Sequence, residues 1–209
     1  MKVIAINGSP RKGGNTDASL QLMGEIFQQN GIEFEVLQIG VKPINGCMAC
    51  GKCSEIERNL CVINNDVVNE WTLKLAEADG IILASPVYYS GIAGNMKSAI
   101  DRLFYHKGEM FKYKVGAVMC ATRRAGASST IDQLMHYLTL NQMIIVGSTY
   151  WNIIHGREKG EMLKDEEGVQ TLLTLADNMS WMLKVIKNGE DAVEKPTPRE
   201  KVWTHFVRD

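Results

Sequence analysis

The sequence contains no long hydrophobic run and no excess of charge of one sign. Its apolar stretches all fall short of the roughly 20 residues that a membrane helix needs, and the opening MKVIAINGSP reaches Gly and Pro too early for a signal peptide. The 23 basic and 24 acidic residues give a formal net charge of -1, which provides no electrostatic attraction to nucleic acid or to an anionic membrane surface. We therefore expect a cytoplasmic protein that binds neither.

Cysteine is scarce outside one short segment. Four of the five cysteines crowd into residues 47–61, and the fifth, Cys120, ends an apolar run. A secreted disulfide scaffold spreads its cysteines along the chain, so this distribution indicates a reducing compartment in which thiols serve metal or redox chemistry. The histidines lack the spacing of metal ligands, and we expect surface or core roles for His106, His136, His155 and His205.

Apolar β-branched runs alternate with helical patterns along most of the chain. The periodicity predicts strands over residues 3–6, 34–39, 80–84, 115–120 and 143–146. It predicts helices over residues 15–29, 67–78, 92–105, 129–140 and 168–186. This alternation predicts an α/β fold in which helices cover both faces of a parallel sheet. We expect one such domain at residues 1–187 and a charged, proline-containing C-terminal tail at residues 188–209.

The segment GSPRKGGNT, residues 8–16, joins the first predicted strand to the first predicted helix. Free backbone N–H groups and the helix dipole favour an anion at such a position, and glycines let the backbone close around it. Further donors for a phosphate group come from Ser9, Arg11, Asn15 and Thr16. This loop is therefore a candidate phosphate site.

Two familiar nucleotide motifs do not fit this loop. A P-loop needs Lys and then Ser or Thr after its last glycine, whereas Asn15 and Thr16 follow Gly14. The glycines also lack the G-x-G-x-x-G spacing of a dinucleotide fingerprint. An ordinary strand-to-helix turn, with Asn15 or Thr16 as the N-cap, remains the alternative to a phosphate site.

Two further loops are expected at the same edge of the sheet, because the carboxyl ends of parallel strands meet there. The loop SPVYYSG, residues 85–91, offers tyrosine rings for stacking and backbone groups at a turn with Pro and Gly. The loop ATRRAGASS, residues 121–129, offers donors and small residues that let a ring edge approach the backbone. Both suit a flat ring with a polar edge, and core packing is the alternative role for Tyr88 and Tyr89.

Most of residues 1–150 resemble the NADPH-dependent FMN reductase family. The resemblance rests on two motifs, GSPRKGGNT at residues 8–16 and SPVYYSGIAGNMKSAIDR at residues 85–102. The resemblance implies a flavodoxin-like three-layer sandwich with a five-stranded parallel sheet in the order 2-1-3-4-5. It also implies a homodimer or homotetramer. Asp101 and Arg102 match the family pattern as well, but we expect an ion pair or cap from them rather than a place in the site.

The same resemblance implies which residues hold FMN. Its phosphate would be bound by Ser9, Arg11, Asn15 and Thr16. Its ring and ribityl chain would be wrapped by Pro86, Val87, Tyr88, Tyr89, Ser90 and Gly91. The ring would be bordered by Thr122, Arg123 and Gly126.

The four clustered cysteines follow the pattern C-x2-C-x2-C-x7-C, at Cys47, Cys50, Cys53 and Cys61. Thiolates spaced in this way in an irregular loop can converge on an iron–sulfur cube. The motif is similar to that of the iron–sulfur flavoprotein branch of the family, which implies a [4Fe-4S] cluster beside FMN. A tetrahedral zinc site and a loop without metal are the alternatives.

These features predict an FMN-dependent oxidoreductase that uses NAD(P)H to reduce a flavin, a quinone or a similar acceptor. The flavin performs the redox chemistry, so no catalytic side chain is assigned. The alternative is an iron–sulfur flavoprotein that carries electrons between redox partners through FMN and a [4Fe-4S] cluster. A flavodoxin-type carrier ranks below both, because flavodoxins are typically shorter and strongly acidic. A binding module for another phosphate compound is the non-enzymatic alternative.

Overall fold

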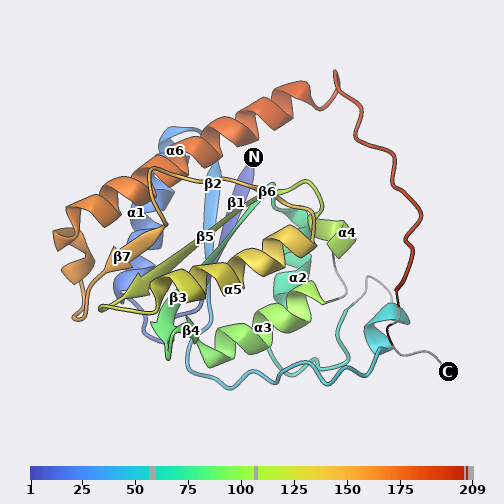
Figure 1. Cartoon of the computed structure of the whole chain (residues 1–209), viewed down its shortest axis with the longest axis horizontal. Coiled ribbons are helices and arrows are strands. Elements are labelled where there is room, and N and C mark those ends of the chain that lie inside the picture. The colour runs from blue at the N-terminus through green and yellow to red at the C-terminus, as the bar shows by residue number, and fades with distance from the viewer. Residues whose placement is uncertain (57–59, 106–107, 205, 207–209) are drawn as a thin grey trace.

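The computed structural model describes residues 1–56, 60–105, 108–204 and 206 (Figure 1). Five of its strands form the parallel path β2-β1-β3-β5-β6 through the sheet. They are β1 (Lys2–Asn7), β2 (Glu33–Gln38), β3 (Gly80–Tyr88), β5 (Val115–Thr122) and β6 (Ile144–Ile145). When these five strands are numbered by their order in the chain, the path reads 2-1-3-4-5, which is the predicted order. The three-layer α/β fold is therefore confirmed.

The sheet has seven strands rather than the predicted five. The first addition is β4 (Gly91–Ile92), which pairs with β3 in antiparallel orientation. The second is β7 (Ile153–His155), which runs parallel to β5. The position beside β5 is therefore shared, with β6 pairing to its first residues and β7 to its last.

The gap between β6 and β7 is closed by a side chain. The Asn152 Nδ2 group donates a hydrogen bond of 2.9 Å to the carbonyl oxygen of Val118, in the stretch of β5 between the two short strands. The Ser148 hydroxyl donates to Asn152 Oδ1 and so orients this amide. An amide side chain thus satisfies a strand carbonyl that a continuous fifth strand would otherwise serve.

Helices cover both faces of the sheet (Figure 1). One face carries α1 (Asn15–Gln29) and α6 (Glu166–Gly189), and the other carries α2 (Val68–Glu77), α3 (Gly94–Phe104) and α5 (Ala127–Leu140). All five were predicted, α1 with the observed bounds. The short helix α4 (Gly108–Phe111) and the 3-10 turns Lys52–Ser54 and Glu161–Lys164 were not predicted.

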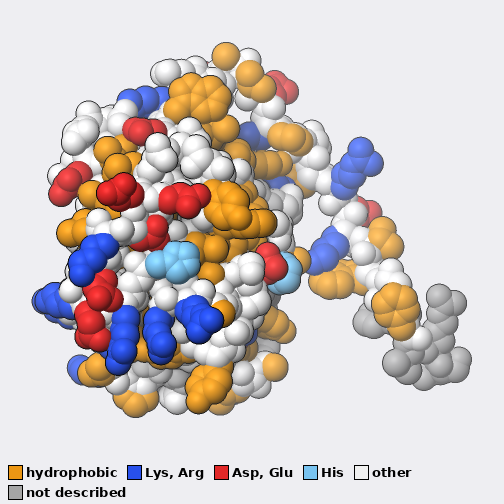
Figure 2. Space-filling view, turned by 60° about the vertical axis from the view of Figure 1, so that its left-hand side comes forward, with side chains coloured by type: hydrophobic (Ala, Val, Ile, Leu, Met, Phe, Trp, Pro, Cys, Tyr) orange, Lys and Arg blue, Asp and Glu red, His pale blue; other side chains and the backbone are white. Residues whose placement is uncertain are grey.

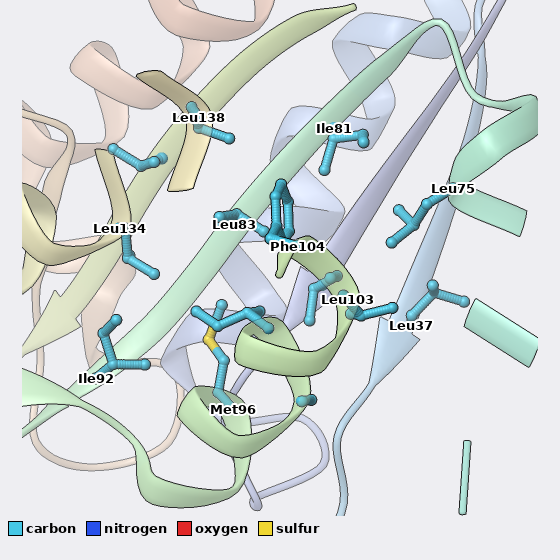
Figure 3. Close-up of a cluster of buried hydrophobic side chains, with 14 of the residues drawn as sticks. Leu37, Leu75, Ile81, Leu83, Ile92, Met96, Leu103, Phe104, Leu134 and Leu138 are labelled. Carbon is cyan, nitrogen blue, oxygen red and sulfur yellow. The ribbon is translucent and has the colours of Figure 1, made fainter. Parts of the chain in front are cut away.

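Successive residues of β1 point into two different hydrophobic clusters. Val3 and Ala5 pack with α1 and α6, whereas Ile4 and Ile6 pack with α2 and α3. Figure 3 shows the second cluster, in which Leu83 of β3 lies among side chains of α3 and α5 such as Phe104 and Leu134. Burial on both faces explains why these strands are uniformly apolar rather than alternating with polar residues.

The C-terminal segment leaves the domain after α6. Residues 190–204 and Phe206 form neither helix nor strand. Val193, Glu194, Lys195 and Pro196 still line a hollow together with Asp79 and Lys114, and Figure 1 shows the later residues running apart from the layers. Trp203 is 70% exposed and Phe206 is 94% exposed. The predicted helix over 168–186 extends to Gly189, and the division into a domain and a tail stays a prediction. Within the described part of the chain, no helix is both long enough and apolar enough to span a membrane.

The contact between α1 and β2 gives a stability prediction. A Cβ on Gly24 would lie 2.6 Å from a ring carbon of Phe34, whose ring stacks on Phe27 at 5.2 Å between centroids. We expect Gly24→Ala to lower the free energy of unfolding by about 1–3 kcal/mol, because overpacking outweighs the better helix propensity of alanine. Urea unfolding measures this change.

The matched control is Gly189→Ala at the end of α6, where no heavy atom lies within 4 Å of the added Cβ. This variant should unfold at the wild-type urea concentration or slightly above it. Equal stability of Gly24→Ala and the wild type would contradict the predicted clash.

Candidate functional site

A cavity of about 410 Å³ opens at the carboxyl edge of the sheet. The loop between β1 and α1 contributes Ser9, Arg11, Lys12, Gly14, Asn15 and Thr16 to its lining. The ends of β3 and β5 contribute Pro86, Val87, Tyr88, Ala121, Thr122 and Arg123. The segment after β7 contributes Gly156, Arg157 and Lys159. Most of the predicted FMN-binding residues therefore meet in one place.

The loop between β1 and α1 is held by its own hydrogen bonds. Asn7 Oδ1 accepts from the Ser9 backbone N–H at 3.0 Å, and Asp17 Oδ2 accepts from the Gly13 N–H at 2.8 Å. The N-cap of α1 is Gly14, which has no side chain to cap the helix. The alternative in which Asn15 or Thr16 caps this helix is therefore wrong. Gly14, Asn15 and Thr16 line the cavity, so the start of α1 lies at its wall without a side-chain cap, as an anion site requires.

The predicted loop at residues 85–91 is largely a strand. β3 continues to Tyr88, and its pairing with β1 ends at the Asn7–Ala84 pair. Pro86 lies two residues beyond the last β1–β3 pair, so the N–H group that it lacks is not needed by that ladder. The strand thus delivers Pro86, Val87 and Tyr88 to the cavity wall.

The turn between β3 and β4 consists of Tyr89 and Ser90, with φ values of 49° and 58°. This left-handed conformation is unfavourable for residues other than glycine. Ser129 Oγ on α5 donates to the Ser90 carbonyl oxygen at 2.7 Å. A Cβ on Gly126, just before α5, would lie 2.6 Å from Ser90 Oγ, so the turn fits only against a glycine there.

The predicted residues Tyr89, Ser90, Gly91 and Gly126 therefore form a group beside the cavity and are not part of its lining. Tyr88 is 45% exposed, and Tyr89 is fully exposed. Core packing, the alternative role of these tyrosines, is thus excluded.

The segment after β7 was not predicted as part of the site. The Gly156 N–H donates to the Thr122 carbonyl oxygen at 2.9 Å, and the Gly160 N–H donates to Asn15 Oδ1 at 3.0 Å. Lys159 extends over the loop between β1 and α1, since a Cβ on Gly13 would lie 2.8 Å from the Lys159 Nζ atom. The sequence signal that was available is the apolar pair Ile153 and Ile154, followed at once by glycine and basic residues.

The lining of the cavity is strongly basic. It contains Arg11, Lys12, Arg123, Arg157 and Lys159, and none of its residues carries a carboxylate. Figure 2 shows Lys and Arg side chains gathered on the face that carries the end of β7 and the start of α6. Such a concentration of positive charge favours an anionic ligand.

His155 belongs to the support of this segment rather than to the cavity lining. Asp165 Oδ2 accepts from the His155 backbone N–H at 2.7 Å and lies 3.0 Å from His155 Nδ1, while Asp165 Oδ1 accepts from the Gly168 N–H at the start of α6. Burial alone would raise the pKa of Asp165, but the hydrogen bonds from Gly168 and His155 outweigh it and lower that pKa. His136 is exposed, as expected, and His106 and His205 lie outside the described residues.

The four clustered cysteines have free thiols and line one small hollow of about 20 Å³. The other described residues of its lining, which include Met48, Val62, Ile63 and Tyr105, carry no carboxylate or imidazole. In the described parts of the chain, which omit residues 57–59 of this loop, no three Cys, His, Asp or Glu residues are placed to hold a metal ion. The thiols thus share a site, but the loop would have to rearrange to coordinate a metal group. Cys120 is buried, and burial raises the pKa of its thiol to about 12.

Comparison with known proteins agrees with this geometry. Residues 1–158 match a family described as NADPH-dependent FMN reductase. The chain is 34% identical over 195 residues to an iron–sulfur flavoprotein of Methanocaldococcus jannaschii, and the alignment covers 90% of this chain and 100% of that protein.

Solved structures share the fold. A flavodoxin from the domain Archaea superposes with a TM-score of 0.58 at 14% identity, covering 88% of this chain and 99% of that chain. The flavoenzyme NAD(P)H:(acceptor) oxidoreductase from Paracoccus denitrificans superposes with a TM-score of 0.65 at 17% identity, covering 88% and 97%. At these identities the likeness concerns the fold alone, and it confirms the flavodoxin-like prediction.

The lowered pKa of Asp165 makes part of the folding stability pH-dependent. A carboxylate with a depressed folded pKa stabilises the protein above its unfolded pKa, about 3.9, and this contribution is lost as the pH falls through the folded value. We expect Asp165→Asn, which keeps an N-cap acceptor, to cost about 1 kcal/mol at roughly pH 5 and less at roughly pH 3. Urea unfolding at both pH values measures the difference.

The control for this comparison is Asp132→Asn, which neutralises an exposed carboxylate on α5. It should cost little at either pH. A loss of stability in Asp165→Asn that is the same at both pH values would contradict the assigned charge effect.

Proposed function

The chain belongs to the NADPH-dependent FMN reductase family, and on this basis we propose that it is an FMN-dependent oxidoreductase. In this proposal NAD(P)H reduces the bound flavin, which then reduces a flavin, quinone or similar acceptor. The observation that carries the proposal is the basic cavity, where the uncapped start of α1 meets the ends of β3 and β5.

The residues of the cavity fit the two chemically different ends of FMN. A phosphate monoester is a dianion near neutral pH, and it matches the N–H groups at the start of α1 together with Arg11 and the hydroxyls of Ser9 and Thr16. Tyr88 offers an exposed aromatic surface for a flat ring, and Thr122 and Arg123 lie at the neighbouring strand end. The cavity therefore suits a ligand with a charged tail and a planar head.

FMN held in this cavity would supply hydride and single-electron chemistry between a nicotinamide and an acceptor. The residues of this chain bind and orient it. No aspartate, glutamate, histidine or cysteine lines the cavity, so we assign no general acid or base among the described residues. The cations contribute instead through their charge, because a positive environment stabilises a ring that gains negative charge on reduction.

A second candidate function is favoured by the shared hollow of the four free thiols. In this proposal Cys47, Cys50, Cys53 and Cys61 hold a [4Fe-4S] cluster, and the protein carries electrons between redox partners. The donor set fits, because the hollow offers thiols in an apolar surrounding and the iron–sulfur flavoprotein named above aligns over its full length. Zinc is less favoured, because zinc sites usually draw on two separated C-x2-C pairs, whereas Cys47, Cys50 and Cys53 follow one another at three-residue spacing.

The proposed phosphate site gives a test with two ligands that differ only in the phosphate. We expect Arg11→Ala to weaken FMN binding about 10-fold and riboflavin binding little, because it removes one charge-assisted hydrogen bond to the phosphate. Tyr88→Ala should weaken the binding of both. Quenching of flavin fluorescence measures each dissociation constant.

The matched control is Arg124→Ala, which removes an exposed arginine that is not part of the cavity lining. It should bind both ligands as the wild type does. An equal loss of FMN and riboflavin affinity in Arg11→Ala would contradict the position proposed for the phosphate.

Anaerobic reduction tests the function itself. We expect NADPH or NADH to bleach the visible flavin absorbance of FMN-loaded protein, and a quinone or free flavin to restore it. Iron analysis of the same sample separates the two candidate functions, since a cluster gives about four irons per chain and broad absorbance beyond the flavin bands. Protein that is free of iron but turns over NAD(P)H favours the reductase alone. A flavin that neither nicotinamide reduces would contradict the reductase.

A further inference from the structure

Arg102 is a buried cation next to the segment that carries Cys47, Cys50, Cys53 and Cys61, which we call the cysteine loop. It lies in the last turns of α3, and its side chain is 1% exposed. Burying a guanidinium without partners costs several kcal/mol, so its environment must supply acceptors for its N–H groups. The predicted ion pair exists, but the partner is Asp66 and not the adjacent Asp101, which accepts from Lys97 and Tyr137.

The partners of Arg102 lie on both sides of the four cysteines in the sequence. One terminal nitrogen donates to the Asn45 carbonyl oxygen at 3.1 Å, two residues before Cys47. The other donates to the Ile63 carbonyl oxygen at 2.8 Å, two residues after Cys61, and to Asp66 Oδ1 at 3.1 Å. A single planar guanidinium therefore ties together the two ends of the cysteine loop.

One N–H group of this guanidinium has no partner in the described structure. Arg102 Nε is buried and makes no hydrogen bond, one of two such buried side-chain atoms among the described residues.

Cys61 is also fixed through its backbone. Its N–H donates to Asn69 Oδ1 at 2.8 Å, and Asn69 Nδ2 donates to the Cys61 carbonyl oxygen at 2.8 Å. Cys61 lies two residues before Ile63, whose carbonyl oxygen accepts from the guanidinium, so its fixed backbone lies near a buried N–H group that has no partner among the described residues. A fixed backbone and a free N–H donor are what a thiolate ligand requires for a stable N–H···S hydrogen bond.

We propose that Arg102 is a positioning residue of the four-cysteine site, which ties Asn45 to Ile63 and donates its free N–H to the Cys61 thiolate when a cluster is bound. This inference rests on the second candidate function. Hydrogen bonds and positive charge near cluster sulfurs stabilise the reduced state and raise the reduction potential. Arg102 thus sets the potential of the cluster as well as the shape of the loop.

The test is a redox titration of anaerobically reconstituted protein, followed by electron paramagnetic resonance for the cluster and by absorbance for FMN. Arg102→Lys keeps the charge toward Asp66 but loses the fork and the Nε–H group, and we expect its cluster potential to fall while its FMN potential stays unchanged. It should also lose iron at a roughly 10-fold lower chelator concentration. Asp66→Asn removes a negative charge beside the guanidinium, and its cluster potential should rise.

The control is Asp101→Asn on the same helix, whose carboxylate contacts Lys97 and Tyr137. It should leave the cluster potential and the iron content unchanged. Wild-type potentials in both Arg102→Lys and Asp66→Asn, with full iron content, would overturn this inference and leave the cluster in place. If Arg102→Lys does not fold, an unshifted cluster potential in Asp66→Asn overturns it. Wild-type protein that takes up FMN but no iron would refute the second candidate function, and this inference with it.

Discussion

The parallel pairing of β1, β3 and β5 determines where chemistry can occur in this protein. Because these strands run in the same direction, the segments that leave their carboxyl ends emerge at one edge of the sheet. The cavity forms there, and the cysteine loop begins at the carboxyl end of the neighbouring strand β2. Burial of the strands on both faces holds this edge in place, because any shift in register would move whole rows of core side chains.

The basic lining of the cavity is costly in the absence of an anion. Five cationic side chains repel one another, and the lining itself supplies no carboxylate, although Arg157 lies 3.2 Å from the Glu158 carboxylate next to it. The nearby Asp17 does not serve this purpose, since its carboxylate accepts from the Gly13 N–H and faces Asn7. Asp17 therefore shapes the loop between β1 and α1, and in the proposed function the cations of the lining serve the ligand. Asp165 also serves the structure, because its carboxylate accepts from the His155 N–H in β7 and from the Gly168 N–H in α6 and so joins these two elements.

The sequence predicted the elements whose signals are local and long. α1 has clear apolar periodicity and begins directly after paired glycines, and its bounds were predicted correctly. β3 was predicted too short, because Pro86 normally ends a strand and only the early end of β1 explains its tolerance. β7 was missed because three residues carry no periodicity of their own, and its place depends on the pairing with β5.

The candidate sites follow the same rule. Glycines, hydroxyls and tyrosines in one loop could be predicted to face a ligand, whereas Arg157 and Lys159 join the cavity only through the fold. The cysteine spacing predicted a second candidate site, but not its connection to α3. The role of Arg102 depends on carbonyl groups that lie far from it in the sequence, at Asn45 and Ile63. No local pattern predicts contacts of that kind.

The strained turn at Tyr89 and Ser90 is best explained by the position of Tyr88. A two-residue turn of type I′ needs positive φ at both positions, as at Tyr89 and Ser90, and glycine or asparagine would adopt it at lower cost. The chain instead compensates a tyrosine and a serine through the hydrogen bond from Ser129 and the space left by Gly126. The tight turn folds β4 back against β3 directly after Tyr88, so the Tyr88 backbone is fixed by pairing with Gly91 at the mouth of the cavity. A longer, unstrained loop would leave that ring free to move, and a planar ligand would then have to order it on binding.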